Sequence, residues 1–239
     1  ITRVFMSNNQ VTSLKLTGKK YLIASLIDCV LVILIPNLVS QDASNLASSF
    51  GSIFVSAVVT LLSVVLLLKS NLKNSLGKIT VMLVAYASFS FIAETLWVVY
   101  EHVLNIEPFP SIADFFWLSG YAFLFLFLSY YLKPVKKFIT KTVVLFAVIT
   151  SVVFLIPSIL LTFDQNAGVN EFEFIVALAY PIADALLLGP LAIGVILFFK
   201  VERNVLWSMF LLAVVCYTVG DTFFLALSIN DSYYTGHPM

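Results

Sequence analysis

Residues 90–101 read SFIAETLWVVYE, and they place Glu94 inside a run that is otherwise dominated by apolar and small side chains. A charged side chain at the centre of a membrane helix costs roughly 2.5–3.5 kcal/mol on insertion scales, so such a side chain rarely faces lipid. This stretch therefore predicts a membrane helix whose carboxylate faces the protein interior or water.

The rest of the chain has the same apolar character. Apolar residues make up 61% of the 239 residues, charged residues make up 11%, and the mean hydropathy is +1.03. Ordinary soluble domains carry about 25% charged residues. Crossing the bilayer takes roughly 20 apolar residues, and lipid forces each crossing segment to be helical. We predict an all-α polytopic membrane protein with seven transmembrane helices, at 21–39, 50–69, 79–104, 111–132, 141–163, 172–199 and 204–229.

The basic residues fall in alternate connections between these segments. All 13 lie in four groups: Arg3, Lys15, Lys19 and Lys20; Lys69, Lys73 and Lys78; Lys133, Lys136, Lys137 and Lys141; and Lys200 and Arg203. The other loops are expected to hold only acidic and neutral residues and the two histidines, among them Asp42, Glu101 and His102. The positive-inside rule then predicts a cell-membrane protein with a cytoplasmic segment 1–20 and with Met239 on the outer side.

Two parts of the sequence resemble each other. AETLWVVYEHVLNIEPFP from Ala93 and GDTFFLALSINDSYYTGHP from Gly220 share a small residue, a carboxylate, a threonine, two large apolar residues, a polar loop and a proline. We interpret the chain as a parallel 4+4 internal repeat, with a first four-helix repeat at 21–132 and a second repeat at 141–239. The second repeat has three helices, so an eighth helix is expected after Met239; a true seven-helix protein with an external tail is the alternative.

Apart from Glu101 and Glu173 near span ends, five acidic residues fall within the predicted spans: Asp28, Glu94, Asp114, Asp184 and Asp221. Counting about 1.5 Å per residue places all of them except Asp28 in the outer half of the membrane. Alanine precedes three of them, in IAE at 92–94, SIAD at 111–114 and PIAD at 182–184, and small residues let helices approach closely. We therefore expect these four acids to share an outward-facing pocket.

Two interpretations of these acids stay open. Their burial together could keep them protonated, or hydrogen-bonded to tyrosine and threonine, so that they only fix the helix register. Alternatively, they line a cavity for a proton, a cation or an amine-bearing ligand, which is the default interpretation of ionisable groups inside a membrane. The predicted ligand-binding residues are Glu94, Asp114, Asp184, Asp221, Thr95, Thr222 and Trp97.

Motifs for catalysis or cofactor binding are absent from the sequence. It has no HExxH, Walker A, GxSxG or GxGxxG motif, and it has no lysine in the middle of span 204–229 for a retinal Schiff base. A metal site from Glu101, His102 and His237 lacks ligand spacing, and zero net charge gives no footprint for nucleic acid. We expect no cofactor, no metal and no enzymatic activity.

The motifs around these acids resemble those of a known class of membrane module. AETLW, PFPSIADFFWLSGY, YPIADALLL and GDTFF…YYTGHPM are similar to the eight-helix input modules that precede diguanylate cyclase (GGDEF) and histidine kinase domains in bacteria and archaea. The resemblance covers about half of the chain. It implies a non-catalytic sensor whose last helix leads to a cytoplasmic kinase or cyclase domain, and it implies roles for Glu94, Pro110, Asp114, Pro181, Asp184 and Asp221.

These observations are compatible with three functions. The first is a sensory module of the lipid bilayer in which protonation or ligand binding shifts the helix packing. The second is an accessory subunit that holds partners of a larger membrane complex, or a second copy in a homodimer, through its aromatic surface. The third is an intramembrane hydrolase, which the single Gly220-Asp221 pair without a nearby nucleophile supports poorly.

Overall fold

The computed structural model describes residues 37–106, 108–165, 171–201, 213–220 and 223. These residues are helical apart from caps and turns, with no strand among them. The elements are α2 (Gln41–Lys69), α3 (Ser75–Val98) with its π-helical continuation η2 (Val99–Leu104), α4 (Ile112–Leu132) with the 3₁₀ turn η3 (Lys133–Phe138), α5 (Lys141–Gln165) and α6 (Glu171–Val201).

Five of these helices are long and apolar enough to cross a membrane. They confirm the helices predicted at 50–69, 79–104, 111–132, 141–163 and 172–199, although α2 begins nine residues earlier than expected, at Gln41. The Ser40 hydroxyl caps this start by accepting a hydrogen bond from the Ala43 N–H at 3.1 Å. The other two predicted spans, like segment 1–20, lie largely outside the described residues.

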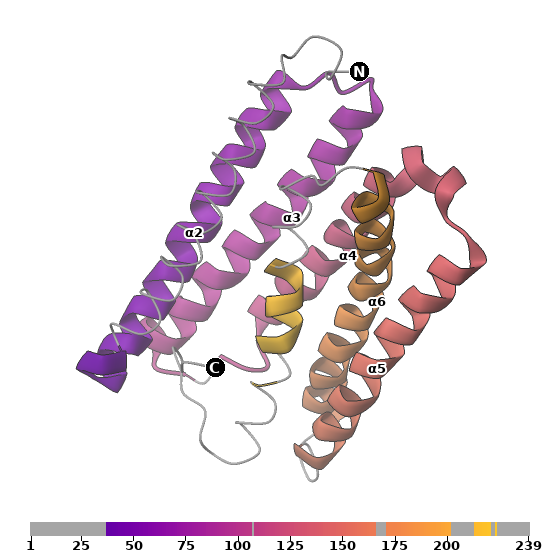
Figure 1. The fold of residues 1–239 in the computed structure, drawn as a ribbon. Helices are drawn as coiled ribbons and strands as arrows, with labels where there is room; N and C mark the ends of the chain where they lie inside the picture. The colour runs from indigo at the N-terminus through magenta and orange to yellow at the C-terminus, as the bar shows by residue number, and fades with distance from the viewer. Residues whose placement is uncertain (1–36, 107, 166–170, 202–212, 221–222, 224–239) are drawn as a thin grey trace.

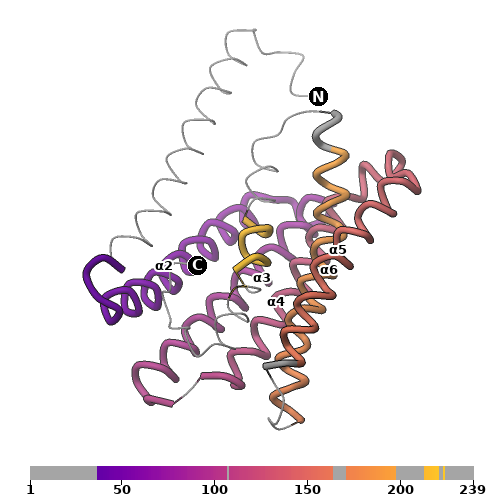
Figure 2. Tube along the Cα trace, turned by 60° about the horizontal axis from the view of Figure 1, so that its bottom comes forward, coloured from indigo at the N-terminus to yellow at the C-terminus, as the bar shows by residue number. Residues whose placement is uncertain are grey.

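The five helices pack in the order α2, α3, α4, α6, α5 rather than in chain order. Each packs against the next one in this series, and Figures 1 and 2 both show α2 at one edge and the α5–α6 pair at the other. The apolar core between α4 and α6 is formed by Tyr121, Leu124, Leu128, Leu132, Leu187 and Leu191. It buries the two helices against each other and fixes the position of the acids that they carry.

Antiparallel neighbours bring the two described lysine groups to the same end of the bundle. The α2–α3 turn carries Lys69, Lys73 and Lys78, and the α4–α5 connection carries Lys133, Lys136, Lys137 and Lys141. The opposite end contains the start of α2, the whole of η2 and the start of α4. We call these the lysine end and the acidic end.

The expectation that Asp42, Glu101 and His102 lie in loops is wrong, although the predicted span 79–104 already reached past the last two. Asp42 lies in the first turn of α2, and Glu101 and His102 lie in η2. A helix can extend past the apolar run when polar side chains of its last turns find partners on a neighbouring helix. Here η2 finds them on α2, as described below.

Candidate functional site

Polar side chains of α2 form a stripe along the face that packs on α3. Asn45, Ser49, Ser52, Ser56 and Thr60 follow one another at spacings of three or four residues, which places them on one helix face. The Thr60 hydroxyl donates to the Ser56 carbonyl at 2.8 Å and to the Ala87 carbonyl of α3 at 2.9 Å. Ala87 is 1% exposed, so the two backbones approach closely at this point.

The π-helical turn η2 meets this stripe at the acidic end. One oxygen of Glu101 accepts a hydrogen bond from the Asn45 amide at 3.1 Å, and the other accepts one from the Trp97 indole N–H at 3.2 Å. His102 lies with its Nε2 3.0 Å from the Ser49 hydroxyl and 4.0 Å from Glu101, and its ring stacks on Phe50. The wider turn of a π-helix rotates Glu101 and His102 relative to a regular α-helix, and such turns are frequent at functional sites.

Glu94 lies two turns before Glu101 on the same helix. Its polar neighbours are Ser52 of α2, whose hydroxyl donates to the Ser49 carbonyl at 3.0 Å, and Trp117 of α4. The rings of Trp97 and Trp117 pack against each other with their centroids 5.2 Å apart, in a tilted arrangement. The carboxylate of Glu94 therefore lies where three helices meet, beside two indole rings.

We call these residues the three-helix cluster. Its members are Asn45, Ser49, Ser52, Glu94, Trp97, Glu101, His102 and Trp117. Glu94 is partly exposed, and the side chains of Glu101 and His102 are 20% and 24% exposed. The cluster is therefore partly buried but can still be reached from outside the protein.

A second group of polar side chains joins α4 to α6. Asp114 is 2% exposed, and its Oδ1 accepts a hydrogen bond from the Tyr180 hydroxyl at 2.6 Å. Its Oδ2 accepts one from the Ser111 backbone N–H at 2.7 Å, while the Ser111 hydroxyl accepts from the Ala113 N–H at 3.1 Å. These bonds form a capping box at the start of α4. Asp184 is 6% exposed and follows Tyr180 by one turn, on the same face of α6.

The predicted site residues therefore divide between two places. Glu94 and Trp97 belong to the three-helix cluster, whereas Asp114 and Asp184 belong to the α4–α6 group, and the two places are one turn of α4 apart, between Asp114 and Trp117. Thr95 donates its hydroxyl back to the Phe91 carbonyl at 2.7 Å. Asp221 and Thr222 lie outside the described residues, so the predicted four-acid pocket stays a prediction.

Sequence reasoning missed several members of the cluster. Asn45, Ser49, Ser52 and Trp117 were not among the predicted site residues, and Glu101 and His102 were assigned to a loop. The spacing of the polar residues in α2 is the signal that could have found three of them, because a polar stripe on an apolar helix faces protein rather than lipid. The sequence SIAD is likewise a capping-box pattern, which predicts a structural role for Asp114.

The cluster has acceptors for a positive charge but no fixed cation of its own. Residues 42–68 and 79–132, which include most of α2, α3 and α4, contain no lysine or arginine. Shielded carboxylates without a cationic partner are suited to an ammonium group, which gains from their negative charge. Within the part of the chain that the structure describes, no group of three or more His, Cys, Asp or Glu side chains could hold a metal ion.

Comparison with models of known protein families, with curated proteins and with solved structures finds no match to this chain.

Proposed function

We propose that this protein is a non-catalytic sensory module of a cell membrane, in which the three-helix cluster takes up a proton or an ammonium-bearing ligand from the acidic end. The observation that carries the proposal is the position of Glu94 of α3 beside polar side chains of α2 and α4. Neutralising or pairing this carboxylate changes its interactions with both neighbours. A change in the relative positions of the helices then transmits the event to the lysine end.

The proposed topology follows from the charge pattern. We propose seven spans in this chain, read as two parallel four-helix repeats, with the lysine end in the cytoplasm and an eighth helix leading to a kinase or cyclase domain. The common location of the two described lysine groups at one end supports this orientation through the positive-inside rule. A signal received at the acidic end would then cross the membrane along the helices.

A sensory role requires two helix arrangements with different affinity for the proton or ligand. The test measures them directly, with nitroxide labels at the exposed positions Leu68 of α2 and Leu145 of α5, both at the lysine end, after Cys29 and Cys216 are replaced by alanine. In reconstituted vesicles, pulsed electron paramagnetic resonance should give two populations of the distance between the labels, and their ratio should change between alkaline and acidic pH.

The variant Glu94→Gln should keep the fold and fix this ratio at all pH values. Glu173→Gln provides the matched control, because it neutralises an acid in the first turn of α6 at the same end of the bundle. The control should respond like the wild type. If Glu94→Gln responds to acidification as the wild type does, Glu94 is not the sensing group and the proposal fails.

A scaffolding role in a larger membrane complex is the second candidate, and the exposure of α2 favours it. Only 6% of an 18-residue apolar stretch of α2 is buried, against 39% of such a stretch in α6. A partner helix could therefore cover much of its surface. Purification in a mild detergent distinguishes the two roles, since a scaffold retains a stoichiometric partner and shows no change in helix distances with pH.

A further inference from the structure

A long apolar groove runs along the outer surface of α6, between α4 and α5. It has a volume of about 850 Å³, which lies in the range of small-molecule sites. Both α4 and α5 pack on α6, but they form no extensive contact with each other in the described part of the chain. Small residues line the groove and leave room for an occupant: Ala147 and Ser151 of α5, and Ala185 and Gly189 of α6.

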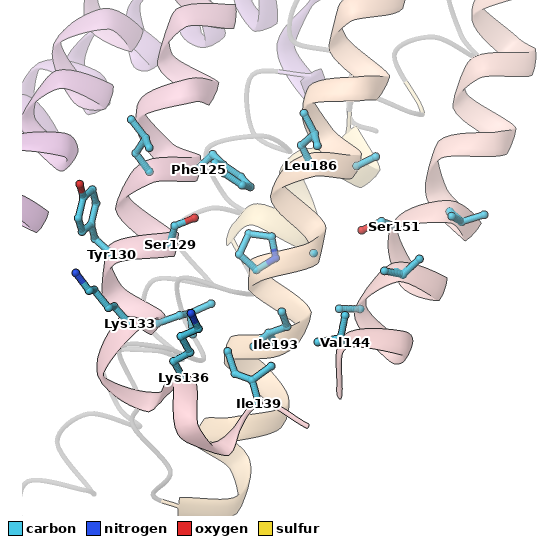
Figure 3. A pocket seen from close by; sticks show the side chains of 18 of the residues that line it. Phe125, Ser129, Tyr130, Lys133, Lys136, Ile139, Val144, Ser151, Leu186 and Ile193 are labelled. Carbon is cyan, nitrogen blue, oxygen red and sulfur yellow. The ribbon is translucent and has the colours of Figure 1, made fainter. Parts of the chain in front are cut away.

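The groove changes character along its length. Figure 3 shows Phe125 and Leu186 toward one end, and Tyr130, Lys133, Lys136 and Ile139 toward the other. Its α6 residues run from Ile182 to Ile193, and 11 steps of about 1.5 Å along a helix span roughly 16 Å. This length is about half of the 30 Å hydrocarbon thickness, so the groove extends over about one leaflet.

The lysines at its end have no acidic neighbours in the described helices. Residues 43–93 and 115–163 contain no aspartate or glutamate, and neither do residues 185–201. In the part of the chain that the structure describes, Lys133 and Lys136 are exposed and form no ion pair. Tyr130, beside them, is the kind of residue that lies at the level of lipid headgroups. This end of the groove is therefore suited to an anionic group.

We propose that the groove binds one anionic phospholipid of the leaflet at the lysine end, with an acyl chain along α6 and the phosphate between Lys133 and Lys136. Three observations select a lipid as the occupant: the length of one leaflet, the apolar walls and the charge at one end only. Basic pockets between membrane helices bind anionic headgroups in the same way. This inference does not depend on the sensory role of the three-helix cluster.

The test compares two lipids with the same acyl chains in vesicles of phosphatidylcholine that hold the full chain. In one sample phosphatidylglycerol carries a nitroxide on an acyl carbon, and in the other phosphatidylcholine carries it. Electron paramagnetic resonance measures the fraction of labelled lipid whose motion the protein restricts. The wild-type chain should restrict phosphatidylglycerol more strongly, and salt should reduce the difference. Equal restriction of both lipids would overturn the proposal.

The double variant Lys133→Gln, Lys136→Gln should lose the preference for phosphatidylglycerol, by roughly five-fold in relative affinity per lysine. Lys73→Gln, Lys78→Gln removes the same charge from the same end of the bundle, away from the groove, and should keep the preference. An equal loss in both variants would mean that the surface charge acts as a whole, and the proposed site would be wrong.

A third variant, Ser129→Phe, fills the groove from an exposed position of α4 without changing charge. It should lower the restricted fraction of both lipids, because it competes with the acyl chain. An unchanged restricted fraction would show that the chain does not lie in the groove. A polypeptide retained there in place of lipid, found by cross-linking from position 129, would also overturn the proposal.

Discussion

The Asp114 carboxylate uses its two oxygens for two different purposes. One oxygen accepts the Ser111 backbone N–H and closes the capping box of α4, and the other accepts the Tyr180 hydroxyl of α6. A buried carboxylate costs free energy unless donors satisfy it. Both donors are therefore needed, and Asp114 holds the start of α4 against α6.

The variant Tyr180→Phe removes one donor and keeps the ring. It should lower the free energy of unfolding by about 1–3 kcal/mol, because it leaves one oxygen of a buried acid without its protein donor. Unfolding in mixed micelles with increasing dodecyl sulfate measures the change. Tyr100→Phe is the control and should change stability little, since the Tyr100 hydroxyl forms no hydrogen bond in the described part of the chain. A similar loss in both variants would contradict this account.

Individual acids were easier to predict than their partners. Glu94, Asp114 and Asp184 were identified as membrane acids because each interrupts an apolar run, and the structure places each of them in a helix. Which side chains face them depends on the rotation of each helix about its axis and on which helices are neighbours. That information lies in contacts far apart in sequence, such as the 56 residues between Asn45 and Glu101.

At the scale of the elements, the end of η2 depends on the backbone conformation of Asn105. Asn105 has φ of 51°, in the left-handed region, and the next N–H, that of Ile106, donates to the Tyr100 carbonyl at 3.0 Å. Asparagine and glycine are the residues that end helices in this conformation at low cost. The end of η2 fixes where Glu101 and His102 meet α2.

Substitutions at position 105 should separate this backbone requirement from side-chain effects. Asn105→Gly should leave stability nearly unchanged, whereas Asn105→Val should cost about 1–2 kcal/mol, because a β-branched side chain clashes in the left-handed region. The same micelle titration measures both variants. If valine is tolerated as well as glycine, the left-handed conformation does not hold the turn in place.

The end of this element was predicted and its type was not. The expected span 79–104 ends at the same residue as η2. A π-helical turn, however, leaves no mark in the hydropathy pattern. It is selected by the contacts of Glu101 with Asn45 and of His102 with Ser49, which no local pattern encodes.

For the whole molecule, the orientation in the membrane can be tested independently of function. In a background without Cys29 and Cys216, a membrane-impermeant maleimide applied outside intact cells should label the exposed Ile106→Cys and leave Lys73→Cys and Lys137→Cys unlabelled. The two lysine positions should react fully once the cells are opened, which controls for their accessibility. Labelling of Lys73→Cys from outside would reverse the proposed orientation.

The packing order α2, α3, α4, α6, α5 has a mechanical consequence. In a closed ring of helices, a displacement of one helix reaches the opposite helix through two sets of neighbours. The more rigid set then transmits most of the displacement. The described helices form an open series instead, so a displacement of α2 reaches α5 only through each contact in turn. The least rigid of these contacts therefore limits how far the displacement is transmitted. Within this series, a tyrosine–aspartate hydrogen bond at one end and a leucine-rich core along the rest hold α4 against α6.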